Sequence, residues 1–507
     1  MPANANQTPA PHDQQEVTQV PLQIVGGTKF GRYSKISSEA TWNMIVSDGW
    51  LVPYAGWASA LDLNSSASGR GAFSSYVGNL MVVVLGTAVY SVLAQNSTST
   101  PLVATLVGSL YTESGDVYIA ENNNAEICIT DGLYVYVYNW STGVFVSSNP
   151  STTDCFPFGD PTAPFTNPGY ISFQNGYLII ACSSSTNWVL SGINNATTWG
   201  YTSQTVGAIQ TKPDFCQAVV PVPGGGNNAL VFGRNVTELW QFTAAALFPY
   251  QRQSTSNIDY GCLNTATIAH LTDYVVWLAV NEQSGPVIMV AHSGAQIEQI
   301  STDGIDYQLG NLTDPTNCTG FLFQQDGHII YQFTFPTDNI SYAYDFNTKM
   351  FFNVSDENLD YHPAREVVYF NNTYYFVALS LGNVYQFDTI ITTANYSLAD
   401  SSTVYIIPRQ RVCPSLRLPD QRYYIANSLG FTIEQGQADS GNVSLSISRN
   451  GGESYGSSYT LQMNNTGYFL NRFIFQRLGI ANDATFLIRF NAYGRIVVTD
   501  GLIELQR

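Results

Sequence analysis

The sequence predicts a mainly β protein, with a six- or seven-bladed β-propeller followed by a C-terminal β-sandwich-like domain. Charged residues make up only 11% of the 507 residues, fewer than the roughly 25% usual in globular domains, which disfavours long solvent-exposed helices. The 32 Tyr and 27 Phe suit strands, because flat rings pack well on a pleated surface. A hairpin pattern that repeats along most of the chain is typical of propeller blades.

The segment from Val20 to Trp57 shows no clean hydrophobic periodicity. Residues 1–19 are rich in Pro, Ala, Asn and Gln and predict a flexible N-terminal tail. They contain neither the positive segment nor the apolar segment of a secretion signal, so we expect synthesis in a cytoplasm. Residues 20–74 predict a lead-in segment that packs on the C-terminal domain.

Residues 75–404 predict the propeller. A polar turn followed by a strand rich in Val, Ile and Tyr recurs there. The seven copies begin at Gly78, Asp131, Asn175, Asn228, Asp273, Asp326 and Asn371. Asp-Gly and Asn-Gly pairs favour tight hairpins, because both residues tolerate a positive φ. Spacings that alternate between forty-odd and fifty-odd residues fit one four-stranded blade per copy. An array of β-sandwiches with similar hairpins is the alternative.

Residues 405–507 predict the β-sandwich-like docking domain. Segments such as 443–448 and 486–490 alternate apolar and polar residues with period two, as expected for sheets with one solvated face. The charge also changes at this boundary. Nine basic residues stand against thirty acidic ones before residue 405, whereas ten Arg stand against seven acidic residues after it. This asymmetry indicates a different partner for the last fifth of the chain, or a sandwich that uses Arg for solubility.

Catalytic, metal and nucleic-acid-binding patterns are weak. The five His (12, 270, 292, 328 and 362) have no second ligand at metal spacing, and Gly224 to Gly226 lack the Lys and helix of a phosphate loop. Four carboxylates, Asp303, Asp306, Asp326 and Asp345, could meet in space, although turn formation explains each of them. A net charge of −18 excludes a protein that binds nucleic acid over its whole surface. We therefore expect no enzyme, no metal and no cofactor.

The cysteines and the Asn-x-Ser/Thr sites bear on the compartment. Seven cysteines are scattered singly, and their odd number favours free thiols in strand cores. Acceptor sites such as Asn96, Asn139 and Asn442 are frequent, as in a secreted eukaryotic propeller that carries glycans. We interpret them as a consequence of composition and keep the secreted propeller as an alternative.

Several short segments together suggest a family. Pro21 to Gly27, Trp42-Asn43-Met44 and the Gly-rich run from Gly49 to Gly56 resemble the start of the packaged-DNA stabilisation proteins of short-tailed bacteriophages (podoviruses). The similarity continues in the middle and at the end of the chain. It is carried there by residues 231–240, 446–455, 472–479, 486–489 and 501–505.

The resemblance implies a structural virion protein of the phage tail, made in the host cytoplasm. Members form the tail hub or nozzle, a homo-oligomeric ring, here expected to be a hexamer, below the portal and adaptor. The ring would extend the DNA channel, retain packaged DNA and contact tail fibre, spike or needle proteins. DNA would pass through the channel without specific binding, and no catalytic residue is implied.

One segment of the C-terminal domain is a candidate for adaptor docking. Arg472 and Arg477 flank the apolar residues Phe473 to Phe475, so charge could surround an apolar contact. The predicted docking residues are Arg472, Phe473, Phe475 and Arg477. The alternative function is a carbohydrate-binding or carbohydrate-cleaving β-propeller protein.

Overall fold

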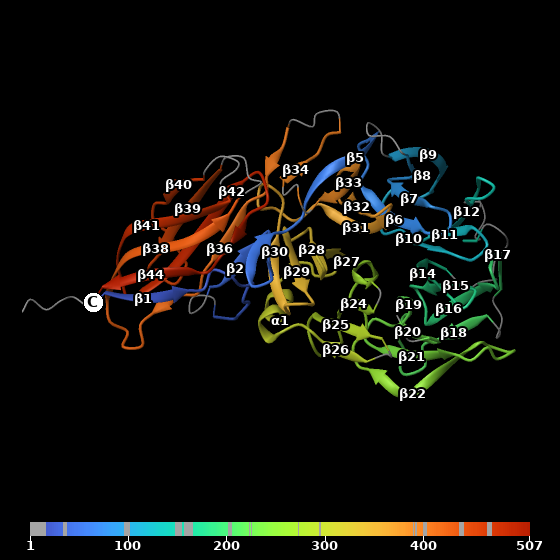
Figure 1. The fold of residues 1–507 in the computed structure, drawn as a ribbon. Coiled ribbons are helices and arrows are strands. Elements are labelled where there is room, and N and C mark those ends of the chain that lie inside the picture. Colours follow the sequence, from blue (N-terminus) through green and yellow to red (C-terminus); the bar gives the residue numbers. More distant parts are fainter. Residues whose placement is uncertain are drawn as a thin grey trace, which may run out of the picture.

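The computed structural model places a β-propeller beside a β-sandwich, which confirms the predicted fold class (Figure 1). It describes residues 17–506 except 34–37, 96–101, 148–154, 157–165, 201–204, 223, 225, 272, 294–295, 389, 391–392, 399–402, 436–440 and 464–468. Residues 1–16 of the predicted flexible tail lie outside the described residues, whereas Val17 to Gln19 belong to a strand. The helices described are η1 (Thr265–Thr267) and α1 (Asp303–Gly310). None of the described helices has the length and hydrophobicity to cross a membrane.

Six blades each consist of four strands that follow one another in the chain. The first three blades are β6 (Gly69–Ser75), β7 (Leu80–Leu85), β8 (Ala88–Ala94) and β9 (Leu102–Ser109); β10 (Tyr118–Glu121), β11 (Glu126–Thr130), β12 (Val135–Asn139) and β13 (Val144–Ser147); and β14 (Pro168–Gln174), β15 (Tyr177–Cys182), β16 (Asn187–Gly192) and β17 (Asn195–Trp199), with β18 (Val206–Ala208) beside β16. The next three are β19 (Ala218–Pro221), β20 (Asn228–Phe232), β21 (Thr237–Phe242) and β22 (Tyr250–Ile258); β23 (Ala269–Leu271), β24 (Tyr274–Ala279), β25 (Val287–His292) and β26 (Ile297–Gln299); and β27 (Thr319–Gln325), β28 (His328–Phe335), β29 (Ile340–Asp345) and β30 (Met350–Val354).

A seventh blade closes the ring with a strand from the start of the chain. It contains β31 (Ala364–Phe370), β32 (Thr373–Ala378), β33 (Gly382–Asp388) and β5 (Gly56–Ser65), and continues into β34 (Thr393–Asn395) and β35 (Tyr405–Ile406). β5 runs antiparallel to β33, with Trp57 opposite Phe387. β31 also packs against β6 of the first blade. The described blades therefore number seven, within the predicted six or seven.

The structure differs from the sequence prediction at the start of the propeller. Residue 75 is the predicted boundary, but β5 and β6 already belong to blades. Neither strand follows an Asp-Gly or Asn-Gly turn, so the local hairpin signal misses both. Two of the predicted turns have this form: Asn175 and Gly176 have φ of 51° and 89°, and Asp326 and Gly327 have 49° and 86°, whereas at Asp131-Gly132 only Gly132 has a positive φ. Positive φ at both central residues is the requirement of a type I′ turn.

The sandwich combines strands from both ends of the chain. One sheet contains β1 (Val17–Leu22), β44 (Gly501–Gln506), β38 (Tyr424–Glu434), β43 (Val497–Val498), β4 (Trp50–Pro53) and β3 (Met44–Ser47), with β41 (Leu470–Ala481) paired to β38. The other contains β2 (Ala40–Trp42), β36 (Arg409–Val412), β42 (Asp483–Ala492), β39 (Gly441–Ser448) and β40 (Tyr459–Gln462), with β37 (Leu416–Arg417) paired to β42. Residues 17–22 and 40–53 thus pair with the C-terminal strands.

A continuous sheet joins the propeller to the sandwich. β2 pairs in parallel with β30 of the sixth blade, Trp42 opposite Asn353, and antiparallel with β36 of the sandwich. A single apolar core also crosses this junction, from Phe323 and Phe387 in the blades to Phe431 and Phe486 in the sandwich. The shared core and the β2 to β30 pairing would both have to open for the two parts to bend apart, so they restrain the relative motion of propeller and sandwich.

Candidate docking face and central cavity

The predicted docking residues lie on β41 but do not share one face. Phe473 and Phe475 are only 4% and 2% exposed, and both rings stack on Phe431 of the core. Arg472 is exposed, because successive side chains of a strand point to opposite faces. The prediction that both phenylalanines form an apolar docking surface is therefore wrong. Arg477 is exposed in a left-handed conformation, φ 61°, beside a break in the β38 to β41 register.

The opposite face of β41 carries apolar side chains that the sequence reasoning missed. Ile474 is 39% exposed and Ile480 is 58% exposed. Ile480 lies opposite exposed Ile425 of β38, and Gly430, which pairs with Ile474, also pairs with exposed Leu502 of β44. We call Ile425, Arg472, Ile474, Ile480 and Leu502 the outer face of the sandwich. The period-two pattern of β41 indicates that alternate residues are exposed, so it could have identified these positions. The sequence prediction instead placed the Phe residues on the exposed face.

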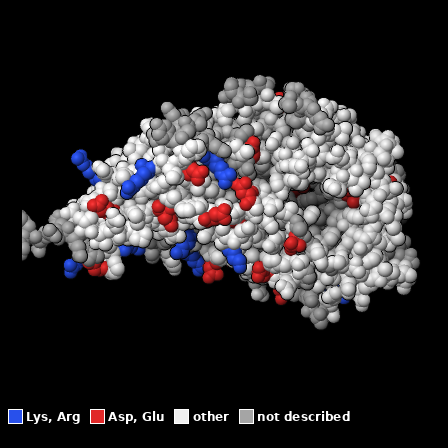
Figure 2. All heavy atoms as spheres, in the orientation of Figure 1, with Lys and Arg blue, Asp and Glu red and all other residues white. Residues whose placement is uncertain are grey.

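Cations gather on the sandwich half of the visible surface, whereas the propeller half shows few (Figure 2). Several propeller arginines form ion pairs within the protein. Arg365 forms an ion pair with Asp116, and Arg252 lies 3.8 Å from Glu238. Asp and Glu lie on both halves of this view, so the part of the predicted asymmetry that is visible here is the gathering of cations on the sandwich half (Figure 2).

Arg70, which the sequence prediction placed in the lead-in segment, is a buried residue of β6. Its guanidinium donates five hydrogen bonds. They go to Gly86 O, Gly115 O, Thr112 O, Thr112 Oγ1 and Ser114 O, at 2.6 to 3.0 Å. Only a guanidinium has a donor fork that can satisfy so many carbonyls. Arg70 therefore fixes the connection between the first two blades.

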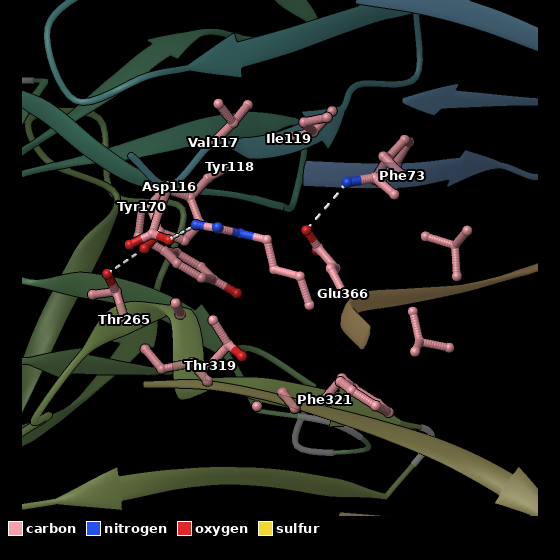
Figure 3. A pocket seen from close by; sticks show the side chains of 18 of the residues that line it. Phe73, Asp116, Val117, Tyr118, Ile119, Tyr170, Thr265, Thr319, Phe321 and Glu366 are labelled. Atoms are coloured by element: carbon pink, nitrogen blue, oxygen red, sulfur yellow. Dashed lines mark hydrogen bonds and ion pairs between the residues drawn. The ribbon is translucent and has the colours of Figure 1, made fainter. Parts of the chain in front are cut away.

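The innermost strands of six blades and η1 surround a cavity of about 250 Å³ at the centre of the propeller. Figure 2 shows a hollow in the propeller half of the surface, and Figure 3 shows the side chains that line the cavity. Polar groups enter it from different blades. Tyr118 of β10 shares a 2.5 Å hydrogen bond with Thr265, and the Arg365 to Asp116 ion pair links β31 to the start of the second blade.

Glu366 places a carboxyl group in this cavity. The backbone amide of Ala72 donates to its Oε2 at 3.1 Å. Burial raises the pKa of Glu366 to about 7, while the Ala72 hydrogen bond and the Arg365 charge oppose the rise. Burial likewise raises the pKa of the nearby Tyr170 hydroxyl, with a smaller contribution from Glu366. The cavity therefore holds a carboxyl that changes charge near neutral pH.

The sequence candidates for catalysis do not form a common site. Asp303 and Asp306 lie on α1, and Asp326 lies 3.8 Å from Arg495. Asp345 is buried and bonds to Nδ1 of His328 at 2.9 Å. In the described part of the chain, no three His, Cys, Asp or Glu side chains gather as metal ligands would. His12 lies outside the described residues, and the seven cysteines are all buried.

Comparison with known proteins gives two matches to family models. The model described as the beta-propeller of bacteriophage P22 Gp10 matches residues 39–392, and the model described as its beta-sandwich matches residues 409–506. No curated protein matches the chain. Similar solved structures include the computationally designed Ika8 protein, with 12% identity, 72% of this chain and 100% of that chain covered, and a TM-score of 0.37. Dihydro-heme d1 dehydrogenase NirN has 13% identity and a TM-score of 0.40, and the match covers 82% of this chain and 79% of that chain. Likenesses this distant carry no functional argument.

Proposed function

Because the chain belongs to the family of bacteriophage P22 Gp10, the phage tail-hub and DNA-stabilisation protein, we propose that it forms the nozzle ring below the portal and adaptor. In this role it extends the DNA channel and retains packaged DNA, and it catalyses no reaction. The ring is a hexamer of identical chains and also contacts tail fibre, spike or needle proteins.

The observation that carries the proposal is the continuous sheet from the sixth blade into the sandwich. A tail ring must hold its position against the pressure of packaged DNA, so a flexible hinge between its two parts would be unsuitable. The β30, β2 and β36 ladder and the shared core provide a stiff connection. Two domains joined by a simple linker would move relative to each other by default.

The charge distribution is consistent with a conduit for DNA. Each contact between a cation and a phosphate adds a salt-dependent attraction that would slow DNA movement. The residues before 405, which include the propeller, are strongly acidic, and Arg252 and Arg365 lie beside carboxylates. DNA is therefore able to pass without being held by the propeller.

The outer face of the sandwich fits the docking surface for the adaptor. It presents Ile425, Ile474, Ile480 and Leu502 next to Arg472, an apolar centre with a charge at its edge. Interface cores are enriched in apolar residues, and Arg is favoured at interfaces. This set replaces the predicted one, because Phe473 and Phe475 are unavailable to a partner.

Co-assembly with the portal and adaptor tests the proposal. The I474D/I480D variant places charges on the outer face, whereas the control L106D places one on exposed Leu106 of β9 in the propeller. We expect wild type and L106D to form a ring on the adaptor in electron micrographs and I474D/I480D to remain unbound. Absence of any ring with the wild-type chain would contradict the proposed function. Equal binding of all three proteins would contradict the assigned docking face.

A further inference from the structure

The central cavity of the propeller contains a buried polar group without a protein partner. Thr319 lines the cavity from β27, its side chain is only 6% exposed, and its hydroxyl forms no hydrogen bond within the described residues. Buried hydroxyl groups are almost always hydrogen-bonded in native proteins. The hydroxyl oxygen itself has almost no surface open to the cavity, so a molecule there would provide its missing partner once the Thr319 side chain turns toward it.

Other cavity groups supply both donors and acceptors around the same space. Arg365 and Tyr170 carry N–H and O–H donors, while Asp116 and Glu366 carry carboxyl acceptors. Figure 3 shows Tyr170, Thr319 and Glu366 around the cavity, each from a different strand. A ligand that offers several hydroxyl groups can satisfy such a mixed set, because each hydroxyl both donates and accepts.

The charges of the cavity disfavour an ionic ligand. Asp116 is already paired with Arg365, so neither charge is left without a counterion. An anion would meet the carboxyl groups of Asp116 and Glu366, and a cation would meet Arg365 and Arg70. Arg70 also lines the cavity, but its five donors are already bonded to Gly86, Thr112, Ser114 and Gly115. Transfer of an ion into this partly buried space would therefore cost solvation without a dedicated counter-charge.

The walls of the cavity are aromatic and aliphatic. Phe73, Tyr118, Tyr170 and Phe321 lie among its lining residues, and the rings of Tyr118 and Tyr170 pack at 5.0 Å between centroids. Small-molecule sites combine such apolar walls with a few fixed polar groups. The volume of about 250 Å³ is close to the lower limit of about 300 Å³ for such sites, which restricts the ligand to a small molecule.

We propose that the central cavity of the propeller binds a neutral polyhydroxylated ligand of the size of a single sugar ring. Its hydroxyl groups bond to Thr319, Tyr170 and Glu366, and the apolar side of the ring faces the aromatic wall. This binding site is additional to the tail-ring role, and it does not depend on the docking face of the sandwich.

Saturation-transfer NMR on the full-length chain tests the site with four probes: methyl α-D-glucoside, methyl α-D-galactoside, methyl α-L-rhamnoside and N-acetyl-D-glucosamine. We expect transfer to at least one of them. T319V and Y170F each delete one cavity hydroxyl with little change in shape, and each should raise the Kd of that probe about fivefold. The controls T105V and Y90F make the same changes on β9 and β8, away from the cavity lining, and should leave the Kd unchanged.

Three outcomes would overturn the proposal. The first is no saturation transfer to any of the four sugars. The second is transfer that T319V and Y170F leave unchanged, because the sugar would then bind elsewhere. The third is stronger competition by inorganic phosphate or putrescine than by an unlabelled sugar, which would identify the cavity as an ion site. Far-ultraviolet circular dichroism of each variant confirms that the fold is intact.

Discussion

The side chain of Asn43 and residue Ser355 exchange two hydrogen bonds across the junction between sandwich and propeller. Asn43 Nδ2 donates to Ser355 Oγ at 2.8 Å, and the Ser355 amide donates to Asn43 Oδ1 at 2.8 Å. Nδ2 also donates to the Pro408 carbonyl at 2.8 Å. One buried amide therefore connects the lead-in, the end of the sixth blade and the segment that enters β36. Asn43 has a φ of 55°, a left-handed conformation that Asn tolerates better than most residues.

Replacement of Asn43 by Ala should destabilise the protein by about 3 kcal/mol, because it leaves the Ser355 amide and the Pro408 carbonyl buried without partners. Denaturant unfolding followed by tryptophan fluorescence measures the effect. N124A changes an exposed Asn in the second blade and should shift the unfolding free energy by no more than about 0.5 kcal/mol. An N43A variant as stable as N124A would contradict the assigned role of the amide.

Neighbouring substitutions on β41 should differ sharply in stability. F473A removes a buried ring that stacks on Phe431 and should cost about 3 to 5 kcal/mol. R472A removes an exposed side chain of the same strand and should change stability by about 0.5 kcal/mol or less. The comparison by chemical denaturation checks the orientation of the strand. A larger loss in R472A than in F473A would mean that the opposite face of β41 is buried.

Substitution of Arg70 by Lys should weaken the connection between the first two blades. Lys has three donors at one point, so it cannot replace the five directed hydrogen bonds of the guanidinium. We expect a loss of about 2 to 4 kcal/mol and faster hydrogen exchange in residues 110–117. R422K, at an exposed position of the sandwich, is the matched control. Unchanged exchange in R70K would show that a charge alone is sufficient at this position.

Local turn chemistry made the repeated hairpins predictable from the sequence. Asn175-Gly176 and Asp326-Gly327 adopt the positive φ values that the residue types favour. The closure of the seventh blade was not predictable in this way. It depends on Trp57 pairing with Phe387, 330 positions later in the chain, and such long-range pairing has no local sequence signal.

The candidate docking site was only partly predictable. The sequence pattern placed the candidate docking residues on one strand, β41, but it did not fix which set of alternate residues faces the core. Phe473 and Phe475 fill space beside Phe431, so the exposed set contains Arg472 and Ile474. The central cavity could not be predicted from the sequence, because Thr319, Tyr170 and Glu366 come from three blades and become neighbours only when the ring closes.

The raised pKa of Glu366 predicts a specific pH dependence of stability. The folded value is about 7, above the ordinary value of 4.5, so the folded protein retains a proton that the unfolded chain releases between these values. The contribution of Glu366 to the free energy of unfolding is therefore fully present below about pH 4.5. It falls as the pH rises to about 7, by up to about 1.4 kcal/mol per pH unit.

The E366Q variant isolates this contribution, because Gln stays neutral at every pH. Other groups titrate in the same range. Burial lowers the pKa of His362 to about 3, so its contribution is lost as the pH falls below about 6.5 and has the opposite sign. His362 is present in both proteins, so its effect cancels in the difference between their unfolding free energies. We expect the stability of wild type relative to E366Q to decrease from pH 5 to pH 7 and to be constant from pH 7.5 to pH 8.5, as measured by urea unfolding. A difference that is constant from pH 5 to pH 8.5 would show that Glu366 is ionised throughout, with the cavity hydrated well enough to keep its pKa ordinary.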